Sequence, residues 1–260
     1  MDLGLKDKVV VVTGSTGGIG EAIVEAFVKE GAKVACTSTR QEKLDRFLPT
    51  LEVEDDQVKG YVLDVTQEDE VEATFKKIFD DFGHIDVVVP NAGYNGDVAM
   101  VKDATDENWR RVFDINVFGV LYTLKYAIPY LEKNDWGSIV VMGSEGSYVG
   151  SPGMSHYCAS KHAVKGLTMS AAMELGGEGI HCNFIAPSAV DTDMMRRIEK
   201  NTFGDSKTPE EAERFFADDS VDKRYAKPEE IAALTVYMAS KHAAHIMGYG
   251  LRIDGGKHIQ

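Results

Sequence analysis

Short apolar runs alternate with longer amphipathic stretches along most of the 260-residue chain. The runs are rich in β-branched residues and hydrophobic at nearly every position, as strands are when both faces of a parallel sheet are covered. They are KVVVVTG from Lys8, KVACTS from Lys33, GYVLDV from Gly60, HIDVVVPNAG from His84, GSIVVMGS from Gly137, IHCNFIAP from Ile180 and YGLRIDGG from Tyr249. Each run predicts one strand.

The stretches between the runs have helical periodicity. In GEAIVEAFVKEG, for example, Ile23, Ala26 and Phe27 fall on one helical face. Strand and helix alternating over this length predict an α/β fold, a doubly wound (Rossmann-type) parallel sheet of about seven strands with helices on both faces. No linker divides the chain, so we expect residues 1–260 to form a single domain.

One segment, residues 194–227, breaks this pattern. It is rich in charged and turn residues, and it precedes a helix that we expect to begin with Pro228, Glu229 and Glu230. A long loop-rich segment inside a compact domain is usually functional. We therefore interpret it as a lid over a substrate rather than as a solvated excursion.

Composition excludes several classes of protein. The formal net charge of -14 and the pI near 4.9 argue against a nucleic-acid binder, which normally carries a basic face. Cys36, Cys158 and Cys182 have neither disulfide-like nor zinc-like spacing, so no metal is expected. The start MDLGLKDKVVVV is too short and acidic for a secretory signal, and no apolar run approaches the length of a membrane span. We expect a cytoplasmic protein with neither nucleic acid nor membrane as a partner.

A glycine-rich turn follows the first predicted strand, with glycines at positions 14, 17, 18 and 20 before a helix. Glycines let the backbone turn sharply and approach a ligand closely, and a helix N-terminus is favourable for a pyrophosphate. A second such turn, PNAG at 90–93, follows the fourth run. Because ligands bind beyond the carboxyl ends of parallel strands, the two turns predict a dinucleotide site.

Two similar octapeptides, YCASKHAV from Tyr157 and YMASKHAA from Tyr237, each place a tyrosine four residues before a lysine. Only Tyr157 has a hydroxyl, Ser144, at the end of a preceding strand, so we interpret Tyr237 as helix packing. A phenol near an ammonium is stabilised as phenolate by about 4 kcal/mol at 4 Å and an effective dielectric of about 20. We therefore expect Lys161 to lower the pKa of Tyr157 well below its usual value of about 10 and make it an acid–base catalyst.

These motifs, taken together, resemble the short-chain dehydrogenase/reductase family along essentially the whole chain. The matching residues are TGSTGGIG from Thr13, Asp64-Val65, Asn91-Ala92-Gly93, Asn116 in DINVFG, Ser144, Tyr157 and Lys161. Three positions depart from the family pattern. Pro90 replaces a second asparagine, Ser188 replaces a glycine, and Gly17 stands where many NADP-dependent members have arginine.

The resemblance implies a catalytic tetrad of Asn116, Ser144, Tyr157 and Lys161. Tyr157 is then the general acid/base, Ser144 positions the carbonyl, Lys161 lowers the tyrosine pKa and binds ribose, and Asn116 helps to hold a proton-relaying water chain. The implied cofactor-binding residues are Gly14, Ser15, Thr16, Gly18, Ile19, Gly20, Ser38, Thr39, Arg40, Asp64, Val65, Asn91, Ala92, Gly93, Tyr157, Lys161, Pro187, Val190 and Thr192.

The second strand ends in Ser38, Thr39 and Arg40, with no carboxylate before Glu42. Binders of NAD hold the adenine ribose with an acidic side chain at about this place. An arginine beside two hydroxyls suits a 2'-phosphate instead. We therefore favour NADP(H), with NAD(H) as the alternative.

The substrate is less closely defined. Its pocket is expected to include Ser144, Glu145, Tyr157 and Met194, with further lining from Tyr94, Asn95, Glu145 to Gly150, His156, Met195 and Phe203. Glu145 suits either a hydroxyl-rich substrate or a plain surface role, and sugars or polyols, oxoacyl compounds and steroids all remain open.

The reaction predicted is hydride transfer between NADP(H), or NAD(H), and a secondary alcohol or ketone. The alternative is a non-catalytic nucleotide-sensing protein of the same fold. Apolar surface on two long helices, together with the resemblance, predicts a homotetramer or homodimer.

Overall fold

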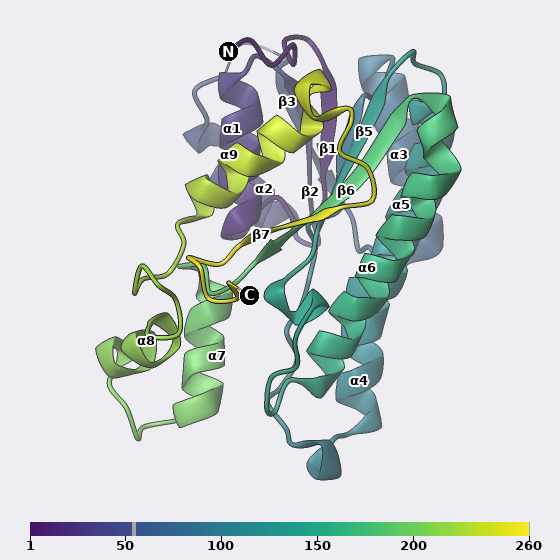
Figure 1. The fold of residues 1–260 in the computed structure, drawn as a ribbon. Coiled ribbons are helices and arrows are strands. Elements are labelled where there is room, and N and C mark those ends of the chain that lie inside the picture. Colours follow the sequence, from purple (N-terminus) through teal and green to yellow (C-terminus); the bar gives the residue numbers. More distant parts are fainter. Residues whose placement is uncertain (54–55, 260) are drawn as a thin grey trace.

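A computed structural model describes residues 1–53 and 56–259, and its centre is a parallel sheet of seven strands in the order β3-β2-β1-β4-β5-β6-β7 (Figure 1). The strands are β1 Val9–Val12, β2 Lys33–Ser38, β3 Val58–Val62, β4 Val87–Val89, β5 Gly137–Met142, β6 Ile180–Pro187 and β7 Gly250–Ile253. Each strand lies within or overlaps one of the seven apolar runs, which confirms the predicted fold class.

Nine α-helices are present in the described part of the chain. They are α1 Ile19–Lys29, α2 Gln41–Phe47, α3 Glu68–Phe82, α4 Asp106–Phe113, α5 Gly119–Leu131, α6 Ser155–Leu175, α7 Asp193–Phe203, α8 Pro209–Ala217 and α9 Pro228–Ala239. The predicted final helix begins at Pro228 as expected. The segment predicted as a loop-rich lid instead forms two helices, α7 and α8.

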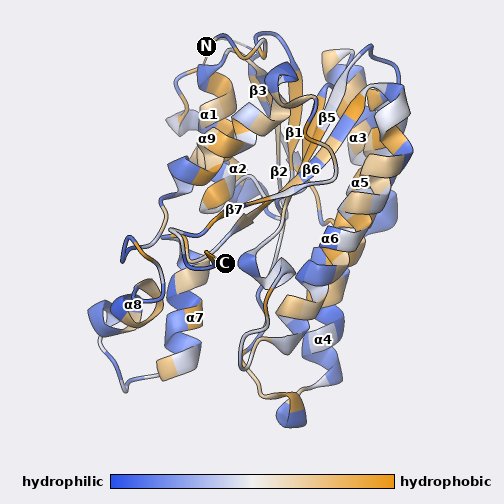
Figure 2. Ribbon diagram, viewed as in Figure 1, coloured by the Kyte–Doolittle hydropathy of each residue, from blue (hydrophilic) through white to orange (hydrophobic). Residues whose placement is uncertain are grey.

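Alternate residues of each strand face opposite sides of the sheet, so two separate cores form (Figure 2). On one side Val10 and Val12 of β1 pack with α1 and α9, through side chains such as Phe27 and Ile231. On the other side Val11 packs with α3, α5 and α6. The central strands β1 and β4 are therefore hydrophobic at every position, because neither of their faces meets water.

The buried carboxylate of Asp86 fixes the start of β1 against the segment that leads into β4. It accepts hydrogen bonds from Lys8 Nζ and from the Val9 backbone N–H, both at 2.9 Å, and lies 3.2 Å from His84 Nε2. A charge in the interior is stable only when it is paired and hydrogen-bonded in this way. This contact helps to hold β1 beside β4.

The order of the strands reverses between β1 and β4, because the chain goes from β1 outward to β3 and then returns to β4. The loops that leave β1 and β4 run to opposite sides of the sheet, and a crevice opens between them at the carboxyl ends of the strands. Within residues 1–53 and 56–259, no helix is both long and apolar enough to span a bilayer.

Asp86→Ala should lower the free energy of unfolding by about 2–4 kcal/mol, because it leaves a buried backbone N–H without a partner and removes a charged acceptor. Urea unfolding measures the change. Asp80→Ala is the matched control, since its carboxylate pairs with Lys76 on an exposed helix surface and should matter by less than about 0.5 kcal/mol. Equal losses in the two variants would contradict this role of Asp86.

Candidate active site

A cavity of about 1650 Å³ lies along the carboxyl ends of the strands. The loops that follow β1, β4, β5 and β6 all contribute to its wall, and so do α2 and α7. It exceeds the roughly 300–1,000 Å³ that a drug-sized ligand needs, so a dinucleotide and a small substrate fit together.

The turn after β1 is a cradle that only glycines permit. Gly14 and Gly18 have positive φ angles of 63° and 43°, and a Cβ at Gly14 would lie 2.9 Å from Ala92 Cα. A Cβ at Gly18 would lie 2.7 Å from Thr192 Cγ2, and one at Gly20 would lie 2.3 Å from the Gly14 carbonyl oxygen. The N-terminus of α1 thereby faces the cavity, where its N–H groups and dipole suit a pyrophosphate. These residues fit a dinucleotide.

Asn91 clamps the two glycine turns together. Its side-chain Nδ2 donates to the carbonyl oxygens of Thr13 and Gly14, each at 3.0 Å. In return, Thr13 Oγ1 accepts hydrogen bonds from the backbone N–H groups of Asn91 and Ala92, at 2.9 and 3.1 Å. The resemblance gave Asn91 a place at the ribose, and in this structure its amide nitrogen is also a structural donor.

The end of the cavity beside β2 differs from the sequence prediction. Arg40 lies outside the cavity lining, and its guanidinium pairs with the exposed Glu42 at 3.1 Å. Lys43 and Arg46 line the cavity instead, together with Ser38 and Thr39. Positions 43 and 46 are three apart on α2 and therefore share one helical face, which is the signal that the sequence offered.

The predicted catalytic groups meet at the opposite end. Ser144 ends the loop after β5 and caps a short 3-10 turn, Glu145–Ser147, by accepting a hydrogen bond from the Gly146 N–H at 3.1 Å. Tyr157 and Lys161 lie one turn apart on α6, as predicted, and all three side chains line the cavity. Lys161 Nζ lies 5.7 Å from the centre of the Tyr157 ring and donates to the Met142 carbonyl oxygen at 2.8 Å.

Asn116 lies just outside the cavity, in a π-helical turn, Asp114–Phe118, between α4 and α5. Its Oδ1 accepts from the Tyr94 N–H at 2.8 Å, and its Nδ2 donates to the Tyr94 carbonyl and to Ser160 Oγ, both at 2.9 Å. Such turns occur often at functional sites. Asn116 thus fixes the loop after β4 to α6 at Ser160, the residue before Lys161.

Burial controls the charges of Tyr157 and Lys161. It raises the pKa of Tyr157 to about 12, although a hydrogen bond with Ser144 opposes the rise. It also lowers the pKa of Lys161 to about 8. The expected lowering of the tyrosine pKa by Lys161 is therefore wrong for this structure, because loss of solvent raises the pKa and the Lys161 ammonium is directed at the Met142 carbonyl oxygen.

The comparison with known families agrees with this geometry. The family described as short chain dehydrogenase matches residues 8–202. The chain belongs to this family. Over 252 residues it is also 34% identical to 3-oxoacyl-(acyl-carrier-protein) reductase FabG of Thermotoga maritima, a match that covers 97% of this chain and 98% of the relative.

Two similar solved structures hold nicotinamide cofactors. ElxO with NADP bound is 29% identical, with a TM-score of 0.88, and the match covers 96% of this chain and 98% of that one. The 3-ketoacyl-(acyl-carrier-protein) reductase from Brucella melitensis, complexed with NADH, is 26% identical, with a TM-score of 0.89 and coverage of 98% and 100%. With the glycine cradle, this makes the protein an NAD(P)-dependent short-chain dehydrogenase/reductase.

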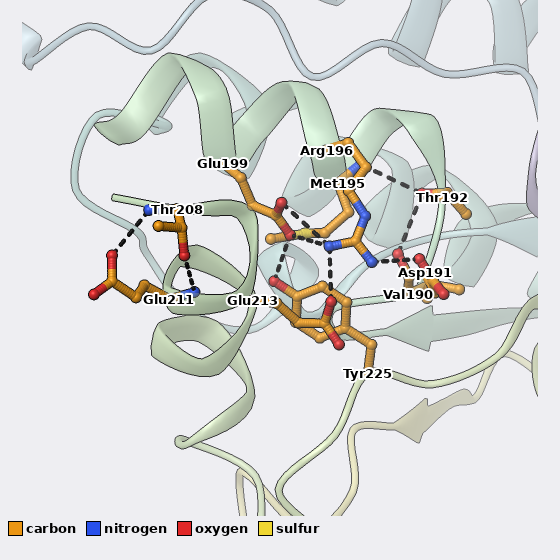
Figure 3. Close-up of polar contacts among 10 residues, drawn as sticks. All are labelled: Val190, Asp191, Thr192, Met195, Arg196, Glu199, Thr208, Glu211, Glu213 and Tyr225. Atoms are coloured by element: carbon orange, nitrogen blue, oxygen red, sulfur yellow. Dashed lines mark hydrogen bonds and ion pairs between the residues drawn. The ribbon is translucent and has the colours of Figure 1, made fainter. Parts of the chain in front are cut away.

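Arg196 holds α7 and α8 to the loop after β6 (Figure 3). Its guanidinium lies among the carboxylates of Asp191, Glu199 and Glu213, at 2.6, 3.0 and 3.0 Å, and packs over the ring of Tyr225. The Tyr225 hydroxyl donates to buried Glu199 at 2.8 Å. Because of these contacts, α7 and α8 are packed against the rest of the domain.

The next residue, Arg197, connects α7 to the loop after β4. Its Nε donates to the buried side chain of Asn95 at 3.1 Å, and its guanidinium lies over the ring of Tyr94. α7 is thereby joined to both sides of the cavity. Arg196 is thus paired with carboxylates, whereas Arg197 lines the cavity and hydrogen-bonds to a neutral side chain.

Most of the predicted site residues line one cavity. They are Gly14, Thr16, Gly18, Ile19, Ser38, Thr39, Asp64, Val65, Asn91, Ala92, Gly93, Ser144, Glu145, Tyr157, Lys161, Pro187, Val190, Thr192 and Met194. Ser15, Gly20, Arg40 and Asn116 are outside the lining, and Ser15 is a buried support that donates to the Thr37 carbonyl oxygen.

The substrate end also differs in detail. Asn95, His156 and Phe203 do not line the cavity, and His156 is buried with its Nε2 3.0 Å from the Asn95 carbonyl oxygen. Ile198 and Phe216 contribute apolar lining that the sequence analysis did not include. The second octapeptide does not line the cavity, because Tyr237 lies on α9 and packs against the core.

Lys161→Met should raise the free energy of unfolding by about 2 kcal/mol at pH 7. The fall of the lysine pKa from 10.5 to about 8 corresponds to about 3 kcal/mol of destabilisation, which the variant removes. The variant also loses the hydrogen bond to the Met142 carbonyl, which costs about 1 kcal/mol of stability. The difference should shrink between pH 8 and 10.5, because folded wild type then has no ammonium to desolvate while the unfolded chain still binds the proton. Urea unfolding at pH 7 and pH 10 provides both values, and a loss of stability at pH 7 would refute the reasoning.

Proposed function

We propose that the protein interconverts a secondary alcohol and a ketone with NADP(H), and that Tyr157 passes the proton. The observation that carries the proposal is that Ser144, Tyr157 and Lys161 line the same cavity as the glycine cradle. A polyhydroxylated, oxoacyl or other carbonyl substrate would enter between the loop after β5 and α7.

A bound nicotinamide supplies or accepts the hydride. The cradle from Gly14 to Ile19 would hold its pyrophosphate, and Thr192 at the N-terminus of α7 would lie near its amide. Ser144 Oγ both donates and accepts hydrogen bonds, so it is suited to hold the substrate oxygen beside the Tyr157 hydroxyl.

The direction of proton transfer follows from the pKa of Tyr157. Because burial raises that pKa, the phenol keeps its proton at neutral pH and is ready to donate it to a ketone oxygen that gains negative charge. Oxidation of an alcohol requires the phenolate. Lys161, still charged below about pH 8, stabilises that form and would also bind ribose hydroxyls.

The preference for NADP(H) rests on the basic end of the cavity. Lys43 and Arg46 from α2 lie there with the hydroxyls of Ser38 and Thr39. Glu21 shares this end, and although burial raises its pKa, Arg46 and Lys43 oppose the rise. Two cations beside two hydroxyls suit a 2'-phosphate, whereas an isolated carboxylate would suit an unphosphorylated ribose.

Self-association as a dimer or tetramer is also part of the proposal. Apolar side chains are exposed on the outer faces of the π turn, α5 and α6, among them Phe118, Leu121, Met169 and Met173, the last 88% exposed. α5 and α6 lie next to each other at one side of the fold (Figure 1). Exposed apolar side chains on neighbouring elements favour packing across a two-fold axis.

Tyr157→Phe should reduce turnover of an alcohol or ketone by at least about 100-fold, because the proton donor is removed. Binding of NADPH, followed by its fluorescence, should change little. Tyr237→Phe, in the second octapeptide, is the matched control and should keep normal turnover. If both variants stay active, or if only Tyr237→Phe fails, the assignment of Tyr157 is wrong.

The double variant Lys43→Ala/Arg46→Ala should raise KM for NADP(H) by at least about tenfold and change KM for NAD(H) by less than about threefold, since only the former carries the extra phosphate. Steady-state rates with both cofactors measure this. Arg40→Ala distinguishes the two assignments, because its side chain lies outside the cavity and should have little effect. If Arg40→Ala raised KM for NADP(H) more than the double variant did, Arg40 would be the residue that binds the 2'-phosphate, as the sequence predicted.

A further inference from the structure

The C-terminal turn brings a lysine to the substrate end of the cavity. After β7, residues 254–257 turn back, with Lys257 N–H donating to the Asp254 carbonyl at 3.0 Å and Val221 N–H donating to the Gly255 carbonyl at 2.8 Å. Both Lys257 and Glu145 line the cavity with the catalytic groups. Residues more than one hundred positions apart are thus brought to one wall.

Glu145 and Lys257 form a half-buried ion pair on this wall. Lys257 Nζ lies 3.4 Å from Glu145 Oε1 and 3.2 Å from Oε2, and the two side chains are 22% and 26% exposed. Among the described residues, Glu145 Oε2 is buried and accepts no hydrogen bond of good geometry. Partly desolvated ions with an unused hydrogen-bond acceptor do not stabilise the fold well. We therefore expect this acceptor to bind a polar group of a ligand in the cavity.

The pair lies close to the reacting groups. Glu145 directly follows Ser144, so their Cα atoms are about 3.8 Å apart. The Glu145 charge is also near enough to contribute to the raised pKa values of Tyr157 and Cys158. A group bound by Glu145 would therefore lie close to the carbon that Ser144 and Tyr157 hold.

The charges at this wall favour a neutral hydroxyl over an anion. Besides Glu145, the carboxylates of Asp219 and Asp254 lie near Lys257 and His258, at 3.7 Å and 3.2 Å respectively. Beside Lys257 and His258, an anionic group would meet the carboxylates of Glu145, Asp219 and Asp254. A hydroxyl both donates and accepts, and a carboxylate beside an ammonium offers one acceptor and one donor to match it.

We propose that Glu145 and Lys257 together bind a second hydroxyl of the substrate, so that the enzyme prefers a vicinal diol or an α-hydroxy ketone, as in a sugar or polyol, over the corresponding simple alcohol or ketone. The inference rests on the proposed alcohol–ketone activity and adds the substrate class. A subsite built to hydrogen-bond a hydroxyl discriminates strongly against the analogue that lacks it.

The test compares kcat/KM for matched pairs, such as 2,3-butanediol with 2-butanol and cyclohexane-1,2-diol with cyclohexanol. Wild type should prefer the diol by at least about tenfold in one pair or more, and Glu145→Ala should reduce that ratio by at least about tenfold. Glu145→Gln keeps an acceptor oxygen and should keep part of the preference. Glu178→Ala, an exposed glutamate before β6, is the matched control and should leave the ratio unchanged.

Lys257→Met probes the other half of the pair. It should raise KM for the diols at least about fivefold with a smaller change in kcat, and KM for the simple alcohols should move much less. A purely structural role would alter both substrate classes alike. Melting temperatures of all variants, compared by circular dichroism, show whether each one is folded.

The outcomes separate the two proposals. If wild type oxidises diols and simple alcohols equally well, or if Glu145→Ala leaves the ratio within twofold, the hydroxyl subsite is wrong while the alcohol–ketone activity stands. If wild type turns over no alcohol, diol, ketone or hydroxy ketone with either cofactor, the proposed function itself is refuted.

Discussion

The contact between the turn after β1 and the turn after β4 is the constraint on which the site depends. Gly14 has no room for a side chain because Ala92 lies against it, and Asn91 ties the two turns through the Thr13 and Gly14 carbonyls. A larger residue at Gly14 would separate the strand ends and turn the N-terminus of α1 away from the crevice. The glycine cradle and the placement of Thr192, at the start of α7 and next to Gly18, both follow from this contact.

Tyr157 and Lys161 lie where loss of solvent opposes charge on either side chain. Burial raises the pKa of Tyr157 and lowers that of Lys161, so each neutral form is favoured. Groups with little solvent around them respond strongly to any charge that enters the cavity, because few water dipoles remain to screen it. The protonation of Tyr157 therefore depends on what the cavity holds more than on the surrounding water. Burial of the Lys161 ammonium lowers the stability of the fold, and such a loss of stability is common at active sites.

The strands, most helices and the glycine cradle could be predicted from the sequence because each depends on local patterning. Side-chain direction was harder. The sequence analysis named Arg40 because it directly follows the second predicted strand, but α2 begins at Gln41, and Lys43 and Arg46 line the cavity instead. The helices α7 and α8 were missed although Thr208 and Glu211 form a capping box at the start of α8. The raised pKa of Tyr157 could not be foreseen, because burial depends on tertiary packing that spacing alone does not reveal.

The α7 end of the cavity is assembled from segments that are far apart in sequence, and polar contacts join them in addition to an apolar cluster that includes Met195, Ala217 and Tyr225. Arg197 of α7 bonds to Asn95, and Lys257 pairs with Glu145 (the Arg196 contacts of Figure 3 support the same wall). Hydrogen bonds and ion pairs are directional, so they fix side-chain positions more narrowly than apolar contacts do. Sequence changes in α7 or in the C-terminal turn can therefore alter the substrate pocket while the sheet and the cradle stay the same. Because of this division, one cofactor-binding frame can keep its geometry while the other end of the cavity changes.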